Sequence, residues 1–416
     1  MPLLCECYYI CSHCKPIALI HMNTNVKSNR LLSLDVMRGI TIAGMIMVNN
    51  PGSWSSVYAP LRHASWNGIT PTDLVFPFFM FMMGVAVYFS LSKSNFSFDK
   101  KFYVKLVKRS VLLFLIGLVL NWFGGFVYNL FRVEDGLSFA DRMTAVYKQF
   151  ESLRILGVLQ RLALAYFFAV LIMAITRKKY VWLIIAVLLG GYTLALYLGN
   201  GFELADTNVI AIVDNSLFGS NHIYRLWHPE NGAIAFDPEG LFSTIPSIAH
   251  VLIGFYAGRL ILDSKTIDVK IEKLLMLGTC LLFAGYLLSY GCPINKSIWS
   301  PAFVLVTCGA GAQLLGFLMW VIDVKGRKKW AVPFESFGVN PLFLYVLAAV
   351  LSVLFSAVPI PAGGGNYTSI HTLLLDGITM LCVDPYLSSL VYALVFVSIN
   401  WVIGNQLYKR RIYIKL

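Results

Sequence analysis

The sequence is poor in charge: only 13% of its 416 residues are Asp, Glu, Lys or Arg, and its mean hydropathy is +0.70. A soluble domain carries about 25% charged residues, so an ordinary globular protein is excluded. P-loop, G-x-G-x-x-G and H-E-x-x-H motifs are also lacking, which argues against ATP-driven and common soluble enzyme classes. No nucleic-acid-binding motif accompanies the net charge of +12, and residues 1–29 lack the continuous apolar region of a cleavable secretory signal.

Cysteine is present in two groups of four. The scattered group lies among apolar runs, as reduced buried cysteine does: Cys280, Cys292, Cys308 and Cys382. The other group crowds near the start with His13: Cys5, Cys7, Cys11 and Cys14. These side chains are zinc-ligand types, yet no second half-site follows. We therefore expect no metal site, and we predict that residues 1–29 are a disordered Cys-rich tail, or a misassigned start, before one membrane domain at 30–416.

Long apolar runs are what the sequence does have. A run of about 20 apolar residues crosses a ~30 Å hydrocarbon core as a helix. The pattern predicts an all-α, polytopic transmembrane bundle of about ten helices, near 34–50, 73–92, 104–123, 155–176, 179–198, 241–262, 271–290, 299–322, 338–357 and 386–405. The shorter apolar stretch at 370–383 is predicted to be an interfacial or re-entrant segment.

The basic residues indicate the orientation of this bundle. Alternate loops and termini carry 25 Lys and Arg on one side and 8 on the other. Basic residues concentrate in cytoplasmic loops, so both termini are predicted to be cytoplasmic. The long loops at 51–72, 124–154 and 200–240 then face outward, and loops of this length usually have a function.

Polar residues in an apolar bundle are costly and mark candidate functional positions. Arg38 and Asp35 are i,i+3 neighbours, which fits either a structural ion pair or part of a phosphate-binding lip. Asn49 closes the first helix, as a cap or as a site residue. The next loop holds His63, with Asp73 ten residues further on; such a histidine is either a solvated side chain or a catalytic one.

Further candidates lie in later segments. Arg161, within an apolar helix, either reaches the interface or lines a polar cavity. Asp237 and Glu239 precede the sixth predicted helix, where they are either helix-capping groups or site residues. Lys105 and Arg109 lie on the predicted cytoplasmic side, where they could contact an anionic ligand.

Six ordered blocks carry a more specific signal. They read RLLSLDVMRGI, MIMVNN, HASWNGITPTDLVFPFFMFMMG, GVLQRLALAYF, AFDPEGLFSTIPSI and NKSIWSPAFVL, and they span the chain from residue 30 onward. This series resembles the heparan-α-glucosaminide N-acetyltransferase family, within the transmembrane acyltransferases. The resemblance implies transfer of acetyl from cytosolic acetyl-CoA to a glucosamine-type sugar across the membrane, with His63 as the active histidine, assisted by Asn49. It also implies a bacterial relative in the inner membrane with a periplasmic active-site loop, and a homodimer.

Acyl transfer chemistry assigns the remaining roles. A neutral imidazole at His63 suits a general base or a transient acyl carrier, and the Asn49 amide suits an oxyanion contact. Acceptor binding, or orientation of the imidazole, is predicted for Trp66, Asp73, Asp237 and Glu239. Binding of acetyl-CoA is predicted for Arg38, Lys105, Arg109 and Arg161. Two alternatives remain open at this point: a transporter or flippase for amino sugars, and a polysaccharide O-acetyltransferase.

Overall fold

Helices begin and end close to the limits of the apolar runs. The structure, a computed structural model, describes residues 31–131, 136–230, 232–364 and 366–414. Within these residues nine helical segments are long and apolar enough to cross a membrane, and one bent pair gives a tenth. The prediction of an all-α membrane bundle is confirmed, while the tail predicted at 1–29 lies outside the described residues.

The crossing helices follow one another in up-and-down order. They are α1 (Leu32–Asn49), α2 (Pro71–Lys93), α3 (Lys100–Leu130), α5 (Val158–Ile175), α6 (Val181–Leu198), α8 (Thr244–Asp263), α9 (Ile267–Leu288), α10 (Pro301–Leu318), the pair α11 (Val332–Val339) and α12 (Pro341–Ala357), and α14 (Pro385–Lys409). The apolar segment that contains α10 continues to Val324 through a stretch of π-helix.

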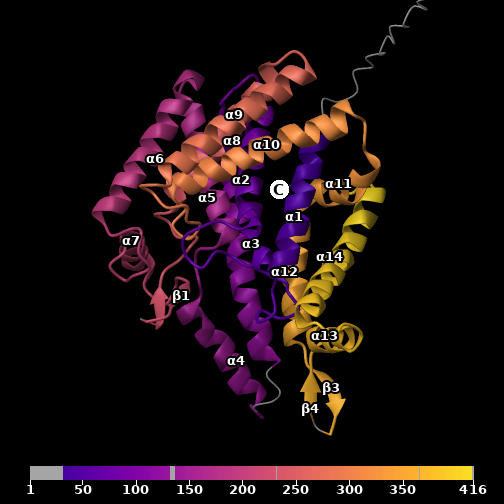
Figure 1. The fold of residues 1–416 in the computed structure, drawn as a ribbon. Coiled ribbons are helices and arrows are strands. Elements are labelled where there is room, and N and C mark those ends of the chain that lie inside the picture. The colour runs from indigo at the N-terminus through magenta and orange to yellow at the C-terminus, as the bar shows by residue number, and fades with distance from the viewer. Residues whose placement is uncertain (1–30, 132–135, 231, 365, 415–416) are drawn as a thin grey trace, which may run out of the picture. The chain divides into compact units, whose positions relative to one another are not determined.

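Smaller elements fill the loops between these helices. They are α4 (Phe139–Lys148), α7 (Val209–Phe218), α13 (Ile370–Leu381) and two antiparallel hairpins, β1 (Arg225–His228) with β2 (Gly232–Ala235) and β3 (Ile360–Gly363) with β4 (Asn366–Thr368). Figure 1 shows α4, α13 and the β3–β4 hairpin at the same end of the bundle. We call this the loop-rich end; the loops at 50–70, 131–157, 199–243, 289–300 and 358–384 all lie there, because successive helices alternate in direction.

Two expectations about the helices need correction. The ninth span is broken, because α11 and α12 meet at an angle of 78°. Pro341 opens α12 and cannot donate a backbone hydrogen bond, while the buried Asn340 side chain binds the backbone of Ile412 and Ile414. The third span is also longer than the predicted 104–123, since α3 continues to Leu130.

Glycines let α2 and α8 approach closely at the centre of the bundle. An added Cβ on Gly84 would lie 2.1 Å from the Val251 carbonyl oxygen, and one on Gly254 would lie 2.1 Å from the Phe81 carbonyl oxygen. Gly254 and Gly258 form a small-x-x-x-small pair, the spacing that allows close contact between membrane helices. Backbone contact therefore sets the position of α2 relative to α8.

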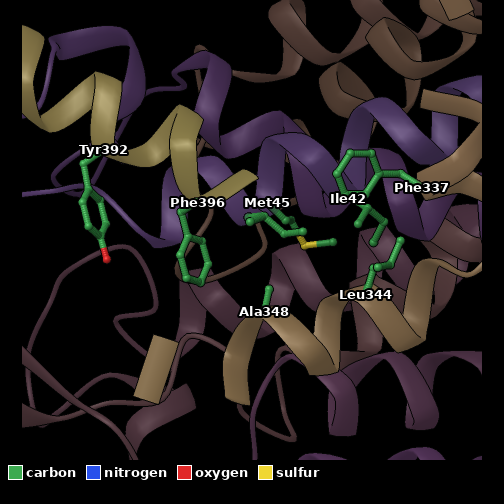
Figure 2. Packing of buried hydrophobic residues seen from close by; sticks show 8 residues of the cluster. Ile42, Met45, Phe337, Leu344, Ala348, Tyr392 and Phe396 are labelled. Atoms are coloured by element: carbon green, nitrogen blue, oxygen red, sulfur yellow. The ribbon is translucent and has the colours of Figure 1, made fainter. Parts of the chain in front are cut away.

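A separate apolar cluster holds α1 against the C-terminal helices. Figure 2 shows side chains from α1, α11, α12 and α14 meeting in this cluster: Ile42, Met45, Phe337, Leu344, Ala348, Tyr392 and Phe396. All of them are at most 7% exposed. The cluster places the last turn of α1, and so the start of the loop at 50–70, beside α14. That loop is also bonded to α14 through Gly52 N and Ser389 O.

We predict that Gly254→Ala destabilises the protein by roughly 1–3 kcal/mol, because the new methyl group forces two helix backbones apart. The measurement is the thermal unfolding temperature of purified protein in detergent. Gly190→Ala is the matched control, since an added Cβ there has no atom within 4 Å. Equal unfolding temperatures for the two variants would contradict close backbone packing of α2 and α8.

Candidate active site

The N-terminus of α2 holds an aspartate that binds the loop in front of it. Asp73 is fully buried in the first turn of α2. One oxygen, Oδ2, accepts hydrogen bonds from the backbone N–H groups of Ala64 and Thr70, both at 3.1 Å, and from the Thr70 hydroxyl at 3.0 Å. The helix macrodipole also favours an anion at this position. Asp73 therefore fixes the last part of the loop at 50–70 onto the helix.

The other oxygen of Asp73 binds the candidate histidine. His63 Nδ1 lies 2.6 Å from Asp73 Oδ1, and the His63 side chain is 49% exposed. A carboxylate can only accept a hydrogen bond, so this contact places the imidazole proton on Nδ1 and leaves the lone pair on Nε2. The structure thus brings together two residues that the sequence predicts separately, and Asp73 orients the imidazole.

A lysine from a loop distant in sequence lies beside the His63–Asp73 pair. Lys296 Nζ lies 3.1 Å from His63 Nδ1 and 3.5 Å from Asp73 Oδ1. Burial lowers the pKa of Lys296, while the nearby carboxylates of Asp73 and Glu239 act in the opposite direction. Sequence reasoning missed this residue as a site member; its one signal was a place in the NKSIW block.

Two further contacts dock the loop at 289–300 against the loop at 50–70. Gly68 N donates to the Ile294 carbonyl at 2.7 Å, and the Asn295 side chain donates to that of Asn67 at 3.2 Å. Asn295 is itself fully buried and receives the backbone N–H of Ile298. The position of Lys296 beside His63 therefore follows from loop packing.

Trp66 connects the loop at 50–70 with the loop after α6. Its indole N–H donates to the Phe202 carbonyl at 2.8 Å, and its ring meets that of Phe236 edge-on at 5.6 Å. The indole N–H is thereby used within the protein. Only the partly exposed ring face remains available to an acceptor sugar. The contacts of Trp66 in the structure hold the loop at 50–70 against the rest of the protein.

Asp237 and Glu239 meet Arg154, which sequence reasoning left out. Arg154 Nε lies 2.9 Å from Asp237 Oδ2, and Arg154 Nη2 lies 2.6 Å from Glu239 Oε2. Asp237 is fully buried and also accepts the backbone N–H groups of Tyr224 and Glu239. These two carboxylates raise the pKa of Arg154 above its ordinary value, against the effect of its burial. The hydrogen bonds of the Asp237 carboxylate to described residues all lie within this network, whereas the Glu239 side chain is 15% exposed.

Asn49 ends α1 at the loop-rich end and is exposed. Its neighbour Asn50 donates a hydrogen bond to the Ile46 carbonyl at 2.7 Å and so takes part in ending the helix. No hydrogen bond links the Asn49 side chain to His63 or to any other residue that the structure describes. The structure places Asn49 at the same end as His63 but does not bond the two.

The residues predicted to bind acetyl-CoA divide between the two ends of the bundle. Arg161 is fully buried in the first turn of α5, at the loop-rich end, and donates to the Gly240 carbonyl and the Ser243 hydroxyl. Arg38, Lys105 and Arg109 lie at the opposite end. Arg38 forms the i,i+3 ion pair with Asp35 at 3.0 Å, while the exposed Arg109 stacks over the Tyr166 ring.

In the part of the chain that the structure describes, no three His, Cys, Asp or Glu side chains are grouped to hold a metal ion. The cysteines at positions 5, 7, 11 and 14 lie outside this part. The described site therefore offers acid–base groups and cations, without a metal centre.

Comparison with known proteins gives one strong similarity. The chain is 30% identical over 372 residues to the human heparan-alpha-glucosaminide N-acetyltransferase, covering 76% of this chain and 52% of the human protein. The mouse protein of the same name is 29% identical over 389 residues, with coverages of 79% and 54%. This chain thus spans about half the length of these relatives.

Two weaker matches accompany it. Residues 30–137 match a family described as a domain of unknown function (DUF5009). A phospho-N-acetylmuramoyl-pentapeptide-transferase from Synechococcus sp. (strain JA-3-3Ab) is 26% identical over 175 residues, which is 41% of this chain and 42% of that protein. This last match covers less than half of either chain, and we infer no function from it.

Asp214 gives a prediction about pH. Its Oδ1 accepts the backbone N–H groups of Leu241 and Phe242, just before α8, while Oδ2 is buried without a partner among the described residues. Burial, aided by the charge of Asp237, raises the pKa of Asp214 from 3.8 to about 6. Since the folded state holds this proton more tightly, the stabilising contribution is complete below pH 3.8 and is lost as pH rises through about 6.

We therefore expect Asp214→Asn to stabilise the protein at neutral pH, by an amount on the order of 3 kcal/mol, and to have little effect near pH 4. Unfolding temperatures of variant and wild type across this pH range provide the measurement. The exposed Asp206→Asn controls for the loss of one negative charge. A difference that stays constant with pH would show that burial does not raise the pKa of Asp214.

Proposed function

Because this chain is a relative of the heparan-alpha-glucosaminide N-acetyltransferase family, we propose that it is a membrane-embedded acyltransferase that moves acetyl from acetyl-CoA to the amine of a glucosamine-type sugar. The observation that carries the proposal is the oriented imidazole of His63 beside the buried Asp73. A transport site needs binding groups, whereas an imidazole with a defined tautomer and a half-exposed face is equipped for proton transfer.

In the proposed mechanism, His63 acts as the general base. The sugar ammonium loses one proton to water, and the neutral amine attacks the acetyl carbonyl carbon of the thioester. His63 Nε2 takes the second amine proton as the new C–N bond forms, and Asp73 stabilises the resulting imidazolium through Nδ1–H. The step needs Nε2 to reach the acceptor, and the exposure of His63 supports this.

Asn49 and Glu239 are proposed to bind the reacting groups. The exposed Asn49 amide can donate its N–H to the oxyanion that develops on the acetyl carbonyl oxygen. Glu239 is proposed to bind the amine of the acceptor sugar. Its carboxylate is partly exposed, acts electrostatically on Lys296 and contacts Arg154. We propose that Trp66 packs its exposed ring face against the sugar, and that Asp73 and Asp237 act through His63 and Arg154.

The proposal also specifies the two sides of the membrane. By the positive-inside pattern, the loop-rich end faces the periplasm of a bacterial inner membrane and the opposite end faces the cytoplasm. Acetyl-CoA carries several phosphate charges that cannot enter lipid, so its nucleotide would stay at the cytoplasmic rim near Arg38, Lys105 and Arg109. Its thioester arm would then reach toward His63 through the bundle.

His63→Ala tests the base. We expect this variant to lose acetyl transfer by about 100-fold or more, while the purified protein stays folded, because Asp73 keeps its contacts with Ala64, Thr70 and Lys296. The assay follows labelled acetyl from acetyl-CoA to glucosamine. His228→Ala, a histidine in β1 at the same end of the bundle, is the matched control and should retain full activity. Uptake of glucosamine without acetylation by the wild type would favour a transporter, and activity that survives His63→Ala would remove the histidine mechanism.

Lys296→Met tests whether the lysine could instead be the base, because burial lowers its pKa. If Lys296 only supports the His63–Asp73 pair, the change removes one charged contact and lowers transfer about tenfold. Lys296→Arg, which keeps the charge, should recover part of the loss. The rates of both variants are measured beside His63→Ala in the same preparation. A Lys296→Met rate as low as that of His63→Ala, without rescue by arginine, would assign proton transfer to the lysine.

A further inference from the structure

Three buried polar side chains meet near the loop-rich end of the bundle. Arg161 from α5 lies with its Cζ atom 5.0 Å from the centre of the Trp299 ring, and the His250 ring from α8 lies 5.9 Å from the same ring. All three are at most 1% exposed. We call this group the indole cluster. Trp299 is three residues after Lys296, so the cluster is directly connected to the candidate active site.

Several polar atoms of the indole cluster lack partners among the described residues. Arg161 uses Nη2 on Gly240 and Ser243, but its Nε and Nη1 make no hydrogen bond to any described residue. The same holds for Trp299 Nε1, whereas the His250 ring forms a hydrogen bond with the Pro77 backbone. A buried donor without a partner costs about 1–3 kcal/mol, and more when it is charged. Three such atoms side by side, Arg161 Nε and Nη1 and Trp299 Nε1, are costly for folding alone, which points to a ligand.

The elements around the cluster bond His250 but leave donors of Arg161 and Trp299 without acceptors. Pro77 interrupts the hydrogen-bond ladder of α2 close to His250, because proline has no backbone N–H to donate. Glu239 and Asp237 lie near enough to act electrostatically on the Arg161 guanidinium. Arg161 is thus a cation whose charge is partly balanced, while its Nε and Nη1 atoms and the indole N–H still require an acceptor.

From this geometry we infer that Arg161 and Trp299 bind the sulfur end of the acyl donor and stabilise the leaving thiolate. The inference rests on the proposed function and adds a second part to its site. A thiolate accepts hydrogen bonds and carries a negative charge, so it satisfies the unpaired donors of both side chains. His250 packs against the same indole ring and helps to fix its position.

In the proposed step, one part of the site accepts the proton and the other stabilises the leaving thiolate. The amine nitrogen forms its bond to the acetyl carbon, and the C–S bond of the thioester breaks. The electron pair of that bond goes to sulfur, whose negative charge is held by the Arg161 guanidinium and the Trp299 N–H. The amine proton goes to His63. The proton therefore leaves the amine nitrogen to His63, whereas the electron pair leaves the acetyl carbon with the sulfur to Arg161 and Trp299.

The test is the dependence of the rate on the leaving group. Arg161→Gln and Trp299→Phe are compared with wild type in the purified protein, using acetyl-CoA and an aryl thioester of acetate whose thiolate is more stable. Because Arg161 stabilises the poorer leaving group more, Arg161→Gln should slow acetyl-CoA by about 100-fold but the aryl thioester by only about tenfold or less. Trp299→Phe, which keeps an aromatic ring, should show the same preference with a smaller loss.

Trp122→Phe is the matched control. The Trp122 indole N–H in α3 is likewise buried without a partner among the described residues, but its ring stacks on Phe126 in α3, not on Arg161. This variant should leave the ratio of the two rates unchanged. Direct binding gives a second readout: wild type should prefer CoA over desulfo-CoA, and Arg161→Gln should lose that preference even where its turnover is too slow to measure.

The outcomes separate the two proposals. Equal rate losses with both donors, together with an unchanged preference for CoA over desulfo-CoA, would make Arg161 a structural residue and overturn the inference while leaving the acyltransferase intact. A wild-type protein that neither binds CoA nor transfers acetyl would overturn the proposed function itself. A donor-dependent loss in Arg161→Gln and Trp299→Phe, absent in Trp122→Phe, supports both.

Discussion

The site depends on the cost of burying one carboxylate. Asp73 is fully buried at the start of α2, and its two oxygens are surrounded by donors from His63, Ala64, Thr70 and Lys296. An ionised group without such partners would be destabilising by several kcal/mol. The loop before α2 and the loop before α10 therefore have to close around Asp73. The orientation of His63 is a consequence of satisfying this one charge.

A second carboxylate is buried and stabilised by partners in the same way, but it does not orient a reactive group. Asp237 is equally buried, but its partners are Arg154 and two backbone amides, and none of them is an exposed titrating group. The pair joins the loop before α5 to the loop before α8 and leaves no reactive atom toward solvent. Burial and charge alone thus do not separate Asp73 from Asp237. The difference is the half-exposed imidazole bonded to Asp73.

The sequence predicts the parts of this molecule that follow from local pattern. Apolar runs of helix length locate the crossing helices because lipid allows few alternatives to a closed helix. The pattern could not show the 78° break at Asn340, since that bend depends on contacts with Ile412 and Ile414, far along the chain. His63 and Asp73 are close in sequence and were found, whereas Lys296 and Arg154 reach the site only through long-range loop packing. Asn49 stays a prediction, because no bond in the described structure ties it to His63.

The arrangement along the bundle gives each group a distinct environment. His63 stands at the mouth, where water can receive the proton that an ammonium must lose before it becomes a nucleophile. Arg161 and Trp299 are buried, so water is excluded and a guanidinium interacts more strongly with a developing anion than it would at the surface. Placed in the reverse order, the base would be cut off from its proton acceptor, and the cation would be screened by solvent. The difference in burial between His63 and the pair Arg161 and Trp299 is therefore part of the chemistry that we propose for them.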